Sequence, residues 1–343
     1  MTIPVSFVNE VTPDEMIPKI GPLVQISTNV GLIFAYGFGL PLPTGDYDSN
    51  SFNWWWVFMF LFPGFVALYQ FCYFLFVCKH DSALWLIRKG RTEETMRSLL
   101  MVYTEEGVND GLERFNPKAK DGDEEKGQSN KEVSLKQIFT EPKYRKMLRI
   151  GILLGVIQQV SGINAGIFYS TSIFSKLGGG LFMSRLFTFI TGFVFMIASI
   201  VSIPLLSKYG RTTLLISGQI LLALDLCALG IMTSFPDSPM ILQIIGVMLI
   251  FVFFSYSLGA TLWLYLGEAM IEQILGISAA ANSTFVCIVT GVFPIAVEYL
   301  GINYAFFFFG ACMILGTIYC YCDLVETKDK SKQEIMNRML HLD

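Results

Sequence analysis

The chain has 343 residues, of which 53% are hydrophobic and only 15% are charged, and its mean hydropathy is +0.54. A water-soluble domain cannot bury so large an apolar surface, so this composition excludes an ordinary soluble protein. The net charge of −4 does not indicate nucleic-acid binding, and two His with seven Cys that lack CxxC spacing predict neither a metal site nor a cofactor.

Eight segments are long and apolar enough to cross a bilayer, which requires about 20 residues per helix. They lie near 20–40, 53–77, 147–174, 182–206, 213–234, 239–267, 276–300 and 302–324. They predict an all-α, multi-pass membrane protein whose helices pack as a bundle in the lipid bilayer. The longest interruption, 78–146, contains fourteen Lys or Arg and is expected to form a cytosolic helical domain.

The basic residues also predict the orientation of the chain, because positively charged short loops stay in the cytoplasm. Most Lys and Arg fall in 78–146, in the turn at Lys208 and Arg211, and in the tail after 324, all on one side. Both termini are therefore expected to be cytosolic, in a protein of the plasma membrane. The predicted parts are 1–77, 78–146, 147–324 and the tail 325–343.

The densest polar stretch inside a predicted span runs from Gln158 to Asn164. On an unbroken helix of 3.6 residues per turn, Gln158, Gln159 and Asn164 would point in different directions, and at least one amide would face lipid. Unwinding at Ser161 and Gly162 would let all three converge on one cavity, as in the broken helices of transporters. Amides suit a neutral polyhydroxylated ligand, because each offers a donor and an acceptor. The alternative is that these amides only join neighbouring helices.

Other polar residues inside predicted spans are weaker candidates, because single residues of these kinds more often serve packing. They are Gln25, Asp225, Trp263, Asn282, Ser283 and Thr284. A Trp indole can stack on a sugar ring and offers one donor. The sequence contains no HExxH or P-loop motif and no Ser-His-Asp arrangement, so nothing in it favours an enzyme.

The polar run and the residues after it resemble a known family. The stretch from Gln158 to Ala165, QQVSGINA, and its continuation from Phe168 to Phe174, FYSTSIF, are similar to the seventh-helix signature of the sugar porters of the major facilitator superfamily. That family includes glucose facilitators and protist hexose transporters. Weaker matches keep the family's order: Asn9 to Pro13, Gln25, Gly210 with Arg211, Trp263 to Glu268, and Glu326 to Lys328.

The resemblance implies the fold, the activity and the site. It implies a major facilitator superfamily bundle containing family helices 5 to 12, and alternating-access transport of a hexose such as glucose. The implied sugar-binding residues are Gln158, Gln159, Asn164, Gln25, Trp263 and Thr284. The implied cytoplasmic gate consists of Glu10, Arg211, Glu268 and Glu326. No metal or other cofactor is implied, and the implied partners are the sugar and the lipid bilayer.

Several positions differ from the family pattern. Ile17 and Leu275 stand where the family has Arg, Phe195 stands where many members have Asn, and Thr284 with Phe285 replaces an Asn-Trp pair. The first four family helices have no counterpart, so the sequence is expected to be a truncated form of a twelve-span porter. Two other functions stay open: a sugar-binding membrane sensor or scaffold that does not transport, and a porter for another small solute, polyhydroxylated or apolar.

Overall fold

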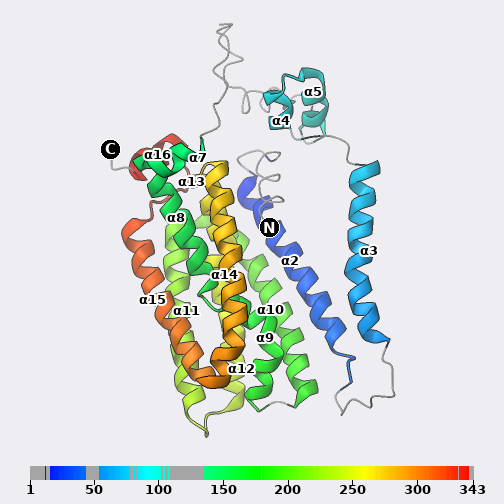
Figure 1. The fold of residues 1–343 in the computed structure, drawn as a ribbon, viewed down its shortest axis with the longest axis vertical. Helices are drawn as coiled ribbons and strands as arrows, with labels where there is room; N and C mark the ends of the chain where they lie inside the picture. The colour runs from blue at the N-terminus through cyan, green and yellow to red at the C-terminus, as the bar shows by residue number, and fades with distance from the viewer. Residues whose placement is uncertain are drawn as a thin grey trace. The chain divides into compact units, whose positions relative to one another are not determined.

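The computed structural model describes residues 12, 16–43, 54–77, 81, 83–101, 103–104, 107–108, 134–178, 180–330 and 332–339 (Figure 1). Helix is the only regular secondary structure in these residues, which confirms the predicted all-α class. The chain divides into two compact units. One comprises Met1–Gly21 and Pro41–Ser134, and the other comprises Pro22–Leu40 and Leu135–Asp343.

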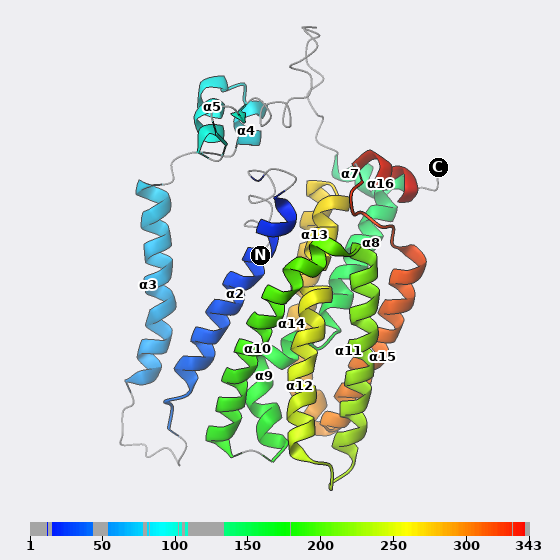
Figure 2. The same cartoon turned by 180° about the vertical axis from the view of Figure 1, so that it is seen from behind.

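The larger unit is a bundle of long apolar helices (Figure 2). Its elements are α2 (Ile17–Gly39, from Pro22 onward), α7 (Leu135–Thr140), α8 (Pro142–Gln159), α9 (Ile163–Lys176), α10 (Leu181–Lys208), α11 (Arg211–Ser234), α12 (Met240–Phe254), the π-helix η2 (Ser255–Gly259), α13 (Ala260–Ala269), α14 (Glu272–Tyr299), α15 (Ile302–Asp323) and α16 (Lys332–Met339).

In the smaller unit, α3 (Trp55–Phe76) is an apolar helix with no buried residue among those described. The short helices α4 (Ala83–Arg88) and α5 (Thr92–Leu100) share a small core in which Ala83 and Leu99 pack with Val108.

Seven helical stretches of the described residues are long and apolar enough to cross a membrane, and they match seven of the eight predicted spans. The remaining predicted span, 20–40, is α2, whose apolar part Leu23–Gly39 is shorter. Helix α8 begins at Pro142, before the predicted start at 147, because Pro is favoured in the first turn of a helix.

Two of the spans are interrupted. Gly162 has a positive φ of 81°, and it separates α8 from α9 at the place where the amide pattern predicted unwinding. The second interruption is η2, where the chain between α12 and α13 forms a π-helix. Local π-helical turns occur frequently at functional sites. Non-helical backbone at membrane depth is tolerated where it is buried in protein or lines a cavity. Both interruptions therefore mark candidate positions of a functional site.

Close approach of helices depends on small residues, because lipid offers no strong hydrophobic force to bring helices together. Gly218 of α11 lies directly against Ser257 of η2, and a Cβ atom at position 218 would overlap with that side chain. The same contact lets the Ser257 hydroxyl donate to the Leu215 carbonyl at 3.2 Å. Gly218 thus allows α11 to hold the π-helix in place.

We expect Gly218→Ala to lower the melting temperature of the purified protein by several degrees, because overpacking costs about 1–3 kcal/mol. Gly291→Ala in α14 is the matched control, since nothing lies within 4 Å of a Cβ atom there. The control should be neutral or slightly stabilising, because Ala favours helix more than Gly does. Equal melting temperatures for the two variants would contradict the close packing of α11 on η2.

Candidate functional site

The break at Gly162 brings together two of the three amides of the polar run. Asn164, in the first turn of α9, donates from Nδ2 to Oε1 of Gln159, the last residue of α8, in a short hydrogen bond. Ser161 completes the turn: its hydroxyl donates to the Gln158 carbonyl at 2.6 Å, and the Ile163 amide donates to that hydroxyl at 3.3 Å. Gln159 is only 3% exposed and Asn164 is half-buried, so a partly buried polar pair lies at the break.

Gln158 makes a different set of contacts. Its Nε2 donates to the Leu258 carbonyl in η2 at 2.8 Å, and its Oε1 accepts from Asn282 Nδ2 in α14 at 2.7 Å. Asn282 also donates to the Gly155 carbonyl of α8 at 3.0 Å. The three amides therefore do not meet at one point: Gln159 pairs with Asn164, whereas Gln158 joins α8 to η2 and α14.

Gln25 belongs to a third group of polar contacts, which links α2 to α10 and η2. Gln25 Nε2 donates to Asn29 Oδ1 at 3.0 Å, and Asn29 Nδ2 donates to Ser199 Oγ at 2.7 Å. Ser199 Oγ and Ser255 Oγ lie 2.7 Å apart. Asn29, Ser199 and Ser255 are fully or almost fully buried, and the sequence analysis did not identify them. The spacing of Gln25 and Asn29, four residues on one helix, was the available signal.

Two predicted site residues make no described contact with these amides. Trp263 is half-buried in α13. Thr284 is exposed on α14, and its hydroxyl donates to the Ala280 carbonyl of its own helix at 2.9 Å. Residues two positions apart on an α-helix point in directions that differ by about 200°. Thr284 therefore faces away from the side on which Asn282 meets Gln158. Asn282 is thus the residue of α14 that joins the amide group.

Aromatic side chains fill the space beside the break. Phe195, at the position where many family members have Asn, is buried and packs against Phe251 and Phe254 with ring centroids 5.4 and 6.3 Å apart. A pocket next to Gly162 is lined by Ala165, Gly166, Leu226, Val247, Phe293 and Phe309, among others. The polar groups that could bind a ligand therefore lie in otherwise apolar surroundings.

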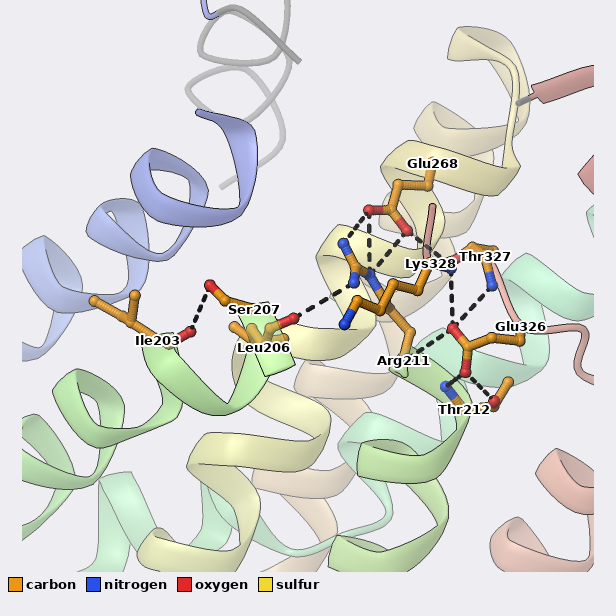
Figure 3. A network of polar contacts seen from close by, with 9 residues as sticks. All are labelled: Ile203, Leu206, Ser207, Arg211, Thr212, Glu268, Glu326, Thr327 and Lys328. Carbon is orange, nitrogen blue, oxygen red and sulfur yellow. Dashed lines mark hydrogen bonds and ion pairs between the residues drawn. The ribbon is translucent and has the colours of Figure 1, made fainter. Parts of the chain in front are cut away.

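A network of charged residues joins the ends of three helices (Figure 3). The Arg211 guanidinium, at the start of α11, donates from Nε and Nη2 to the Glu268 carboxylate of α13 at 2.8 to 3.2 Å. The Arg211 side chain is only 5% exposed. Glu268 also accepts from the Thr327 hydroxyl at 2.6 Å, so the segment after α15 is tied to the same pair. Bidentate, half-buried pairs of this kind are the stronger class of ion pair.

Glu326 caps the N-terminus of α11 from outside that helix. Its carboxylate accepts from the amides of Arg211 and Thr212 at 2.8 and 3.1 Å and from the Thr212 hydroxyl at 2.5 Å. Burial favours the neutral acid, but these hydrogen bonds and one from the Lys328 amide outweigh it and lower the Glu326 pKa. Gly210 leaves the necessary room, because a Cβ atom there would overlap with the carboxylate.

The remaining predicted gate residue, Glu10, lies outside the described residues, as does the side chain of Ile17. Leu275, where the family has Arg, is a buried apolar residue of α14. The structure therefore brings together three of the four predicted gate residues: Arg211, Glu268 and Glu326.

The chain is similar to proteins of known class over most of its length. Residues 1–339 match the family model described as "Sugar (and other) transporter". The probable metabolite transport protein CsbC of Bacillus subtilis (strain 168) is 31% identical over 265 residues, which are 74% of this chain and 55% of that protein. Facilitated glucose transporter member 2 of solute carrier family 2 from Rattus norvegicus is 30% identical over 278 residues, covering 78% and 51%. The chain thus spans about half the length of the curated relatives it matches.

Among solved structures, the proton:xylose symporter XylE bound to 6-bromo-6-deoxy-D-glucose has a TM-score of 0.75 at 20% identity, over 98% of this chain and 70% of that one. The inward-open xylose transporter XylE from E. coli has a TM-score of 0.70 at 20% identity, over 98% and 68%. At this identity the likeness shows the fold, which is that of the major facilitator superfamily. The members of the matched family are transporters and not enzymes. The chain therefore belongs to the sugar (and other) transporter family and is an integral, multi-pass membrane protein.

Proposed function

We propose that this protein transports a hexose such as glucose across the plasma membrane by alternating access. The observation that carries the proposal is the pair of buried Gln159 and half-buried Asn164 at a helix break inside a membrane span. Unpaired amides are costly inside a membrane, so such a group either joins helices or serves a ligand. Here the pair lies across an interruption within one span, where transporter folds bind their substrates.

The chemistry of the amides supports a neutral, hydroxyl-rich ligand. The hydrogen-bond partners of Gln158, Gln159 and Asn164 in the described structure are amides and backbone carbonyls. A sugar hydroxyl can donate one hydrogen bond and accept another at the same time. It can therefore donate to Gln159 Oε1 and accept from Asn164 Nδ2 in place of the bond between them. Replacing one amide–amide bond by two amide–hydroxyl bonds leaves no buried group unpaired. A charged solute would find no charge of opposite sign in these contacts.

Arg211, Glu268 and Glu326 suit the role of a cytoplasmic gate. They join α11, α13 and the segment after α15 on the side where the basic residues predict the cytoplasm. Contacts that are made in only one of two conformations shift the equilibrium toward that conformation. We therefore propose that this network stabilises the conformation in which the cytoplasmic side is closed, with both termini cytosolic.

A second candidate function is a membrane sensor or scaffold that binds sugar but does not transport it. The residue that favours it is Leu275, a buried apolar side chain where the family carries a basic partner of the gate. A gate with fewer ion pairs would hold its closed state less firmly. Sugar binding without flux in reconstituted vesicles would support this function over transport.

Gln159→Ala should reduce the initial rate of D-glucose uptake into proteoliposomes by about tenfold or more. The reason is that loss of a buried hydrogen bond to a ligand hydroxyl costs about 1.4 kcal/mol or more. Gln243→Ala makes the same change at another buried glutamine, near the start of α12, and should leave uptake within about twofold. Undiminished uptake by Gln159→Ala at equal protein density would contradict the assignment of the site.

Glu326→Gln should lower the melting temperature at pH 7, because it removes the carboxylate that caps α11. The folded-state pKa of Glu326 is lowered from its ordinary value of 4.5, so the stabilisation is fully present above that value. It is lost as the pH falls through the lowered pKa. The difference in melting temperature between wild type and variant should therefore narrow below pH 4.5.

Glu334→Gln is the control for this pH series, because Glu334 forms an exposed ion pair with Arg338 within α16. Exposed pairs contribute little, so its melting temperature should stay close to that of the wild type. A difference for Glu326→Gln that does not change with pH would show that the charge of Glu326 does not stabilise α11.

A further inference from the structure

Asn29 lies in the middle of an apolar helix and is completely buried, at 0% exposure. An amide in such a place is costly unless both of its ends are hydrogen-bonded. Asn29 meets that requirement through three neighbours. Its Oδ1 accepts from Gln25 Nε2 at 3.0 Å, and its Nδ2 donates to Ser199 Oγ at 2.7 Å and to the Phe195 carbonyl at 3.4 Å.

The orientation of the Asn29 amide follows from what its partners can do. The Phe195 carbonyl can only accept, so the group that faces it must be the NH₂. The Ser199 hydroxyl donates to the same carbonyl at 3.0 Å, and it therefore accepts from both Asn29 and Ser255. A flipped Asn29 would place its oxygen against the Phe195 carbonyl. The NH₂ thus faces α10, and the carbonyl faces Gln25.

This arrangement also determines which end of Gln25 is available. Asn29 holds the nitrogen of the Gln25 amide, so Oε1 of Gln25 points away from it. In the described part of the chain, no protein group donates to this oxygen. Gln25 is only half-buried, so its Oε1 can act as an acceptor for a ligand. An amide without such a neighbour could present either end.

The packing of α2 places Gln25 near the level of the helix break. Asn29 meets Ser199, and a Cβ atom at Gly37 would lie 3.2 Å from the Phe189 ring. A later residue of α2 thus meets an earlier residue of α10, so the two helices run antiparallel. The Tyr36 hydroxyl donates to the Ile167 carbonyl of α9 at 2.7 Å. Gln25 precedes Tyr36 by about 16 Å of helix, and Gln159 precedes Ile167 by about 12 Å at the same rise per residue, so the two glutamines lie within about one helical turn of the same depth.

We propose that Asn29 is a positioning residue that makes Gln25 an acceptor for one particular hydroxyl of the sugar. This inference rests on the proposed function, because it requires that the site binds a sugar. The site then selects a ligand that has a hydroxyl donor at that position, and it discriminates against the deoxy sugar at the same carbon. Asn29 contributes through Gln25 and not by touching the ligand.

The test measures the binding of D-glucose and of its 1-, 2-, 3- and 6-deoxy analogues to the full chain in detergent. Wild-type protein should bind one deoxy analogue about tenfold more weakly than D-glucose, because that analogue lacks the hydroxyl that donates to Gln25. The affinities for the other analogues do not affect this expectation. Gln25→Ala should reduce that discrimination to about twofold or less. Asn29→Leu should do the same at the same carbon, because Gln25 is then no longer held. The double variant should show no further loss.

Two further variants separate positioning from folding. Asn29→Ser keeps a polar link to α10 but is too short to hold Gln25, so it should lose the same discrimination even if Asn29→Leu does not fold. Ser255→Ala removes a neighbour of Ser199 but leaves all three partners of Asn29 in place, so its discrimination should equal that of the wild type.

The possible outcomes distinguish the two proposals. No binding of D-glucose or of the analogues by wild-type protein would overturn the hexose site and this inference with it. Binding by wild type with an unchanged analogue pattern in Asn29→Leu and Asn29→Ser would overturn the inference alone. Uniform weakening of all five sugars in these variants would also overturn it, because a purely structural role predicts that result.

Discussion

The hydrogen bonds of Gln158 hold together the three segments around which the candidate site is built. Its amide donates to η2 and accepts from α14, and it stands next to Gln159, the last residue of α8 before the Gly162 break. A membrane interior offers no water to replace a lost partner, so neither bond can open without leaving a buried amide unpaired. Gln158 therefore ties the end of α8 to η2 and α14, beside the local pair that Gln159 and Asn164 form across the break. The two adjacent glutamines thus have different parts: one maintains the helix contacts, and the other pairs across the break.

Sequence reasoning found the break but not the pairing around it. The break follows from local chemistry, since three amides at those spacings cannot all avoid lipid on a straight helix that contains Gly162. The pairing depends on how far each neighbouring helix is rotated. In a soluble helix the apolar stripe reveals that rotation, but α14 is apolar nearly all round, so its sequence does not distinguish Asn282 from Thr284 as the inward residue. Asn29 was missed although it lies four residues after Gln25 on one face of α2, because that spacing alone does not show which neighbouring helix the face meets.

The charged network of Arg211, Glu268 and Glu326 was easier to predict because its residues lie at helix ends. Charges concentrate there, and the order of Gly210, Arg211, Glu268 and Glu326 along the chain matches the family. The structure adds the physical reason for the glycine: Glu326 can reach the first amides of α11 only where no side chain stands in front of them. The carboxylate interacts with the positive end of the α11 dipole, and Arg211 is left to bind Glu268. Because Gly210 has no side chain, both Glu326 and Glu268 find partners at the start of α11.

The π-helix η2 connects the two sets of buried amides. Ser255, its first residue, contacts Ser199, which accepts from Asn29 of α2. Leu258, three residues later, accepts from Gln158 of α8. A π-helix is less stable than an α-helix, so such a segment persists only where its surroundings support it. Here the support comes from α11 through Gly218, from α10 through Ser199 and from α8 through Gln158. Asn29 is linked to this segment through Ser199, and Gln158 bonds to it directly. A change in the hydrogen bonds of either amide therefore alters the support of the same five residues.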